Sequence, residues 1–331
     1  MDIHPSRVSG NLAATLLLLC CLIILAGCGA PADASGGTLA PTPVPSPPTP
    51  APPTAPPASK EAPQDDLAPL SDEFDNAQTL SNWRNLATVD GYPNQIETVD
   101  VNTTSPGQLF VVPYTSTWFE DYRGVYLYKE VTGDFDVTTR IQATGKHGPI
   151  PDRTFSLAGL MARAPRDITM DTWVPGHENW VFITTGYGDN EPRRAGKQQI
   201  ETKTTVNSHS VLELVPVTTG WVDLRVVRIG PTFLMLYRPD GGAWILSKRY
   251  TRTDLPPTLE VGLNAYTNWE AIDGDAATFN RTLVTKPRFT ADLQVHSDYI
   301  RFRRPQVADS VRARIAGEGL NNAEWLQAIG P

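Results

Sequence analysis

Hydrophobic and polar residues alternate along short runs of the chain from residue 71 onward, and turn residues separate the runs. In residues 135–144, the side chains of Phe135, Val137, Thr139 and Ile141 share one face, as in a half-buried strand. The predicted strands cover residues 124–131, 135–144, 155–164, 178–188, 198–206, 210–217, 221–229, 232–239, 243–250, 259–267 and 298–304. No helical periodicity interrupts them, so the pattern predicts an all-β sandwich or barrel.

Several of these runs are bulky on both faces. In residues 178–188, Val181 and Ile183 point one way, while Trp180 and Phe182 point the other. Alternation allows only one of these sets to enter the core between two sheets. The second set therefore predicts either the floor of a groove or a face that is covered by loops.

The C-terminal residues 306–331 follow a different pattern, with two short helices expected at residues 307–315 and 322–329. Asn321 and Glu324 have the spacing of a capping box at the start of the second helix. Trp325, Leu326 and Ile329 would form its apolar face. We expect this helical tail to pack on the sandwich, with a partner-binding helix as the alternative.

An apolar run over residues 12–25 follows Arg7. Its last residue begins the sequence Leu25-Ala26-Gly27-Cys28. A positive flank, a short apolar stretch and small residues are typical of a secretory signal peptide, here residues 1–27. The run is shorter than the roughly 20 residues that a membrane-spanning helix needs. Residues 25–28 resemble a bacterial lipobox, which implies that Cys28 becomes a lipidated N-terminus. An uncleaved membrane anchor is the alternative.

Proline, threonine and alanine dominate residues 28–70, a composition that cannot form a core. We expect a disordered linker there, followed by the sandwich at residues 71–305. The three cysteines, Cys20, Cys21 and Cys28, precede this domain, so it contains no disulfide. A net charge of −8 without a basic block argues against nucleic-acid binding.

The motifs GDFDVTTRI, FSLAGLMARAPR, ENWVFITTGYG and WVDLRVVRIGPTFLMLYRPDGGAW, in this order, resemble the concanavalin A-like lectin/glucanase superfamily. The resemblance covers roughly residues 72–305. It implies a jelly-roll sandwich of two antiparallel sheets, one of them concave and able to hold a sugar. Such a fold alone does not establish a function.

Aromatic and amide side chains are the candidates for sugar binding, because a sugar stacks its apolar face on rings and hydrogen-bonds through its hydroxyls. Asn264 and Tyr266 share one face of a predicted strand, and Trp269 lies just beyond it. We predict that they form a site on one sheet with ring faces partly exposed. The full candidate set is Arg163, Asn179, Trp180, Tyr187, Asn264, Tyr266 and Trp269.

The sequence offers no recognisable catalytic residues. Glucanases of the resembled superfamily carry Glu-x-Asp-x-Glu on one strand, and this chain lacks that triplet. Its histidines lack metal-ligand spacing, and no Gly-x-Ser-x-Gly is present. We expect no cofactor, with a calcium ion at Asp273 and Asp275 left open as an alternative.

These observations favour a bacterial lipoprotein that is anchored in the cell membrane or outer membrane, with its domain on the extracytoplasmic side. The expected partners are the lipid bilayer, through the acyl anchor, and a glycan or cell-wall polysaccharide. The favoured function is non-catalytic carbohydrate binding. A glycoside hydrolase or lyase with an unrecognised acid pair, and a scaffold for protein interactions, are the alternatives.

Replacing Cys28 by alanine tests the anchor. We expect the Cys28→Ala protein to remain unprocessed or to be mislocalised, because no other thiol survives the predicted cleavage. Metabolic labelling with a palmitate analogue, followed by membrane fractionation, measures this directly. A variant that still takes up label and fractionates normally would contradict the prediction.

Overall fold

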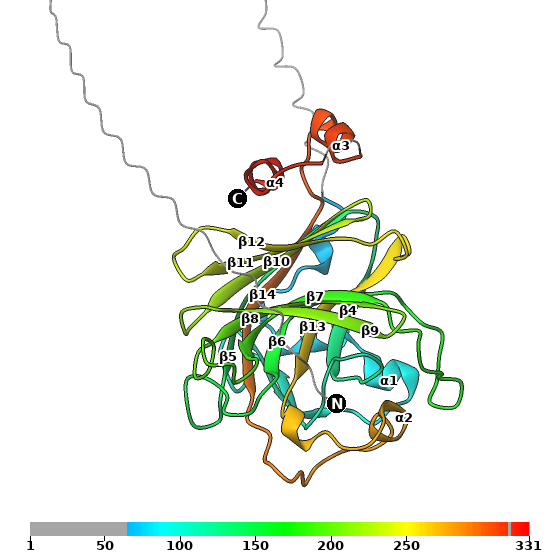
Figure 1. Ribbon diagram of the computed structural model, residues 1–331, viewed down its shortest axis with the longest axis vertical. Helices are drawn as coiled ribbons and strands as arrows, with labels where there is room; N and C mark the ends of the chain where they lie inside the picture. Colours follow the sequence, from blue (N-terminus) through cyan, green and yellow to red (C-terminus); the bar gives the residue numbers. More distant parts are fainter. Residues whose placement is uncertain (1–64, 317–318, 331) are drawn as a thin grey trace, which may run out of the picture. The chain divides into compact units, whose positions relative to one another are not determined.

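The computed structural model describes residues 65–316 and 319–330 (Figure 1). The signal peptide, Cys28 and residues 29–64 of the linker lie outside the described residues. No helix in the described part is both long enough and apolar enough to cross a membrane.

Two antiparallel seven-stranded sheets make up the described chain, which confirms the predicted all-β sandwich. The first sheet has the order β1 (Arg84–Asn85), β4 (Val125–Thr132), β13 (Thr258–Tyr266), β6 (Ser156–Arg163), β7 (Trp180–Tyr187), β8 (Gln199–Val206) and β9 (His209–Pro216). The second sheet has the order β12 (Ile245–Thr251), β11 (Thr232–Pro239), β10 (Val222–Ile229), β5 (Phe135–Thr144), β14 (Gln294–Arg303), β3 (Leu109–Pro113) and β2 (Ile96–Val101).

Short helices connect or follow the strands. They are η1 (Ala68–Leu70), η2 (Ala77–Asn82), α1 (Leu86–Asp90), η3 (Trp269–Ala271), α2 (Ala276–Phe279), α3 (Asp309–Ala316) and α4 (Asn322–Ile329). The sequence pattern did not predict β1, β2 or β3. β3 is a short run buried along its whole length, so it lacks the alternation that identifies a half-buried strand.

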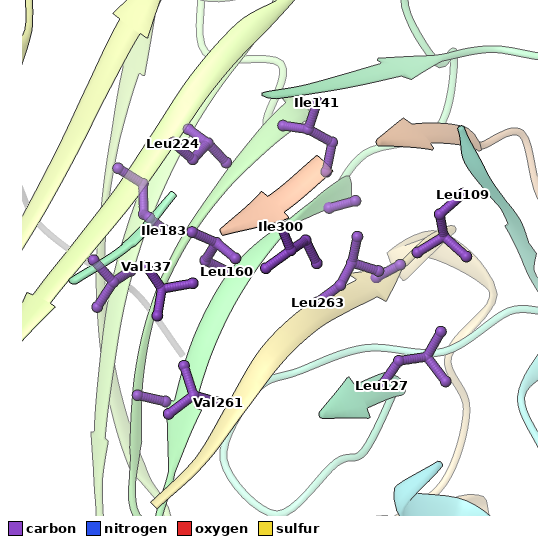
Figure 2. Close-up of a cluster of buried hydrophobic side chains, with 14 of the residues drawn as sticks. Leu109, Leu127, Val137, Ile141, Leu160, Ile183, Leu224, Val261, Leu263 and Ile300 are labelled. Carbon is purple, nitrogen blue, oxygen red and sulfur yellow. The ribbon is translucent and has the colours of Figure 1, made fainter. Parts of the chain in front are cut away.

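The main core lies between the two sheets, where aliphatic side chains from both inner faces meet (Figure 2). The first sheet contributes Leu127, Leu160, Ile183, Val261 and Leu263, and the second contributes Leu109, Val137, Ile141, Leu224 and Ile300. These residues occupy every second position of their strands. The residues between them therefore point to the two outer faces of the sandwich.

The C-terminal tail covers part of the outer face of the second sheet, as predicted. Trp325 and Ile329 on α4 pack with Val227 and Leu234, which point outward from β10 and β11. The predicted capping box is present, since the side chains of Asn321 and Glu324 each accept a hydrogen bond from the other residue's backbone.

The folded domain begins before the expected boundary at residue 71. Leu67 is buried in the main core, and the Nζ of Lys129 donates a hydrogen bond of 2.8 Å to the carbonyl of Leu70. The side chain of Asp65 accepts a hydrogen bond from the backbone of Arg304. The composition of the linker hides this, because two leucines, Leu67 and Leu70, after a proline-rich segment are too few to define a period.

Leu67→Ala tests whether this segment belongs to the core. We expect a loss of about 2–5 kcal/mol in the free energy of unfolding, which denaturant titration measures. Leu283→Ala is the control, because Leu283 is exposed and its truncation changes stability by less than about 0.5 kcal/mol. Equal unfolding midpoints for the two variants would place Leu67 outside the core.

Candidate functional site

The outer face of the first sheet holds four of the seven predicted sugar-binding residues. On β13, Leu263 points into the core, so Asn264 and Tyr266 on either side of Ala265 point away from it. Arg163 on β6 pairs directly with Trp180 on β7 in the strand register. These four side chains therefore lie on one face of the sheet, as strand alternation predicted.

The prediction that these side chains are partly exposed to solvent is wrong. Arg163, Trp180, Asn264 and Tyr266 are all fully buried. The segment at residues 115–123 lies over this face, and its Trp118 packs edge-on against Trp180 with ring centroids 6.1 Å apart. The face is therefore a covered layer, which is the second of the two possibilities that its bulky residues raised.

The other three predicted residues are separated along the strands. Asn179 precedes β7 at the Arg163 end of the sheet, where its Nδ2 donates to the side chain of Asn207. Tyr187 ends the same strand and is buried. Trp269 follows β13 at the Tyr187 end and is 38% exposed. The seven residues thus do not form a single site.

A buried ion-pair network occupies the Arg163 end of the covered face. The guanidinium of Arg163 donates to Glu178 at 2.9 and 3.1 Å and to Glu260 at 2.7 Å. Burial alone would raise the pKa of Glu178, but Arg163 and Arg123 lower it to about 2. Burial raises the pKa of Glu260 despite its contact with Arg163.

A buried lysine occupies the opposite part of the same face. The Nζ of Lys203 lies 2.8 Å from the carboxylate of Glu201 and donates to the carbonyl of Trp118 at 2.9 Å. The hydroxyl of Tyr266 also donates to Glu201. Burial lowers the pKa of Lys203, while Glu201 opposes this shift. Four rings lie 5.1–5.8 Å from the ammonium: Phe119, Phe155, Phe182 and Tyr266.

Sequence reasoning missed these charged residues, although a signal was present. On β8, Glu201 directly follows the core residue Ile200, and Lys203 lies two positions after Glu201. On β13, Glu260 lies between the core residues Leu259 and Val261. Alternation alone assigns all three to the same outer face as Arg163. Their mutual pairing is what allows charges to remain buried there.

Trp269 lies at the rim of the covered face and keeps part of its ring in solvent. It packs edge-on against Phe119, Tyr122 and Phe155, with centroids 5.8, 6.5 and 6.2 Å away. Before it, Asn268 adopts a left-handed conformation with φ +71° and donates from Nδ2 to Thr115 at 2.8 Å. This turn and the surrounding rings hold the indole in place.

A hollow of about 500 Å³ is lined by the segment that begins at Glu270, the residue after Trp269. Its polar lining includes Glu270, Asp273, Lys286 and Arg288. Asp273 accepts a hydrogen bond from the backbone of Gly274, and Asp275 caps α2. Within the described residues, no group of three or more acidic, histidine or cysteine side chains is arranged to hold a metal ion.

Comparison with family models and with curated proteins finds no match to this chain. Similar solved structures include a functionally unknown Saccharomyces cerevisiae protein, at 18% identity and TM-score 0.42, covering 68% of this chain and 98% of that one. A Bacillus licheniformis β-glucanase has 13% identity and TM-score 0.40, with coverages of 71% and 97%. A xylan β-1,4-xylosidase from Bacillus halodurans has 14% identity and TM-score 0.47; 75% of this chain matches 41% of that one. None of these likenesses assigns an activity to this chain.

Glu178→Gln tests the buried network. The pKa of Glu178 falls from its usual 4.5 to about 2 on folding, so its ionised form stabilises the fold above pH 4.5. This stabilisation is lost as the pH falls toward about 2. We expect the variant to be about 3 kcal/mol less stable than wild type at pH 7, with the difference shrinking below pH 4.5. Urea titrations across this pH range measure it.

Glu130→Gln is the control for that experiment, because Glu130 forms an exposed pair with Arg84 that contributes about 0–1 kcal/mol. A stability difference between wild type and Glu178→Gln that is the same at pH 7 and pH 3 would contradict the assignment.

Proposed function

We propose that this protein is a lipid-anchored, extracytoplasmic protein that binds carbohydrate without catalysis. In this proposal Cys28 carries the acyl anchor, and the linker holds the domain away from the bilayer. The sugar docks at the rim of the first sheet, where Trp269 provides the stacking surface.

The partly exposed and well supported ring of Trp269 is the observation that carries the proposal. An indole fixed by three neighbouring rings loses little conformational freedom when a ligand stacks on it. The adjoining hollow offers carboxylates and cations, from Glu270 and Lys286 for example, as partners for hydroxyl groups. Apolar surface combined with a few polar groups is typical of small-molecule sites.

The buried state of the acidic residues on the covered face argues against hydrolysis by that face. A glycosidase needs two carboxyl groups that reach the same glycosidic bond from about 5–9.5 Å apart. On the first sheet's outer face, Glu178, Glu201 and Glu260 are buried and each contacts a cationic side chain. A polysaccharide at the rim would not contact them.

Trp269→Ala tests the proposed site. We expect binding to an immobilised polysaccharide to weaken at least tenfold, about 1.4 kcal/mol, because the stacking surface is removed. The measurement is a glycan array that includes xylan, mixed-linkage β-glucan and peptidoglycan, followed by calorimetry on the glycan that binds. Val215→Ala is the control, since Val215 is 36% exposed and lies on the edge strand β9.

Each outcome of the array distinguishes between the candidate functions. Binding without release of products, lost in Trp269→Ala and kept in Val215→Ala, is the expected result. Release of shortened glycans would favour a hydrolase or lyase instead. A wild-type protein that binds no glycan would favour a scaffold.

A further inference from the structure

The outer face of the second sheet contains a groove that the helical tail leaves open. Its volume is about 190 Å³. Four arginines and two aromatic residues line most of it: Arg225, Arg238, Arg301, Arg303, Trp244 and Tyr299. Since Trp269 adjoins the first sheet, this groove is separate from the rim described above.

The strand register explains why a groove forms at this point. Thr138 on β5 pairs with Arg225 on β10 on one side and with Arg301 on β14 on the other. All three side chains point to the same outer face, because facing residues in paired strands share a side. A short threonine between two long arginines leaves a depression whose walls are guanidinium groups.

Aromatic rings and carboxylates hold the arginines in position. The guanidinium carbon of Arg238 lies 4.6 Å from the ring centre of Trp244, and that of Arg301 lies 3.8 Å from the ring centre of Tyr299. Asp223 accepts hydrogen bonds from Arg238 at 2.8 Å and from the Tyr299 hydroxyl at 3.3 Å. The two walls of the groove are thereby linked through one carboxylate.

Two of the arginines have donor groups left for a ligand. Arg238 contacts Asp223 through Nε and Nη2, and Arg301 donates to Glu73 through the same two atoms. No acceptor among the described residues takes a hydrogen bond from the Nη1 of either arginine. Their side chains are 34% and 54% exposed, so solvent reaches both residues.

Arg225 differs, because its donors are already used. It binds Asp136 through Nε at 2.8 Å and Nη2 at 2.6 Å. It also donates to the carbonyls of Ile329 and Gly330 at the end of α4. Arg225 is therefore fixed between the helical tail and the groove.

We propose that this groove is a second binding site, which takes the carboxylate or sulfate group of an acidic saccharide. Planar guanidinium groups match the oxygen geometry of such anions and form charge-assisted hydrogen bonds with them. A volume of about 190 Å³ offers room for one charged sugar unit. The saccharide part of this proposal rests on the proposed function, whereas the anion contact does not.

Calorimetry on the full-length protein with three polymers tests the groove. The probes are polygalacturonate for carboxylate, dextran sulfate for sulfate ester, and uncharged dextran. We expect the wild type to bind at least one charged polymer, more weakly as salt is raised. We expect Arg238→Gln/Arg301→Gln to weaken that binding at least tenfold. Comparing the two charged polymers shows which anion is preferred.

Two controls separate this proposal from the others. Arg84→Gln removes an exposed, ion-paired arginine on β1 of the first sheet and should leave binding of the charged polymer unchanged. Trp269→Ala should also leave it unchanged, so that loss of neutral-glycan binding and loss of anion binding report on different sites. If the double glutamine variant does not fold, Arg238→Lys/Arg301→Lys replaces it, and loss of the planar donors should still weaken binding.

The proposal is overturned if the wild type binds neither charged polymer. It is equally overturned if a folded double variant binds them as tightly as wild type. Anion binding that depends on Arg238 and Arg301, in a protein that binds no neutral glycan, would support the groove and contradict the proposed function at Trp269.

Discussion

Burial of the two inner sheet faces against each other is the constraint on which the rest of the structure depends. The strands pack aliphatic residues such as Leu160 and Leu224 into one core, and the described residues include no cysteine to reinforce it. Because side chains alternate, this core forces every intervening residue outward. Apolar side chains on both outer faces are therefore covered by other segments. Helix α4 covers those on the second sheet, and residues 115–123 cover those on the first.

The covered face of the first sheet combines rings with buried charges. Such charges remain buried only because partners compensate for lost water, as Glu178 does for Arg163 and Glu201 for Lys203. The same pairing leaves these groups unable to contact a ligand. The proposed binding sites therefore lie where side chains remain exposed. The rim at Trp269 and the arginine groove are two such places, and they lie on opposite sheets.

Strand alternation predicted β4 to β14 and the shared face of Asn264 and Tyr266, and the apolar side of the expected C-terminal helix predicted the packing of Trp325. It could not predict exposure, because the segment that carries Trp118 covers this face from a distant point in the sequence. The sequence pattern also failed to predict where the folded domain begins, because the segment there is too short to show a period. Leu67 enters the core with only Leu70 packed against it from the same segment, and two residues are too few to show a periodic pattern. The sequence therefore predicted which face of the sheet these side chains occupy, but not that another segment covers that face.

A crystal structure of the protein with a bound oligosaccharide tests the central claim most directly. That claim is that the outer face of the first sheet is closed and that neutral sugar binds only at its rim. We predict a sugar ring stacked on Trp269, with Trp180 and Tyr266 still buried beneath residues 115–123. A sugar in contact with Asn264 on the sheet itself, with that segment displaced, would contradict the account.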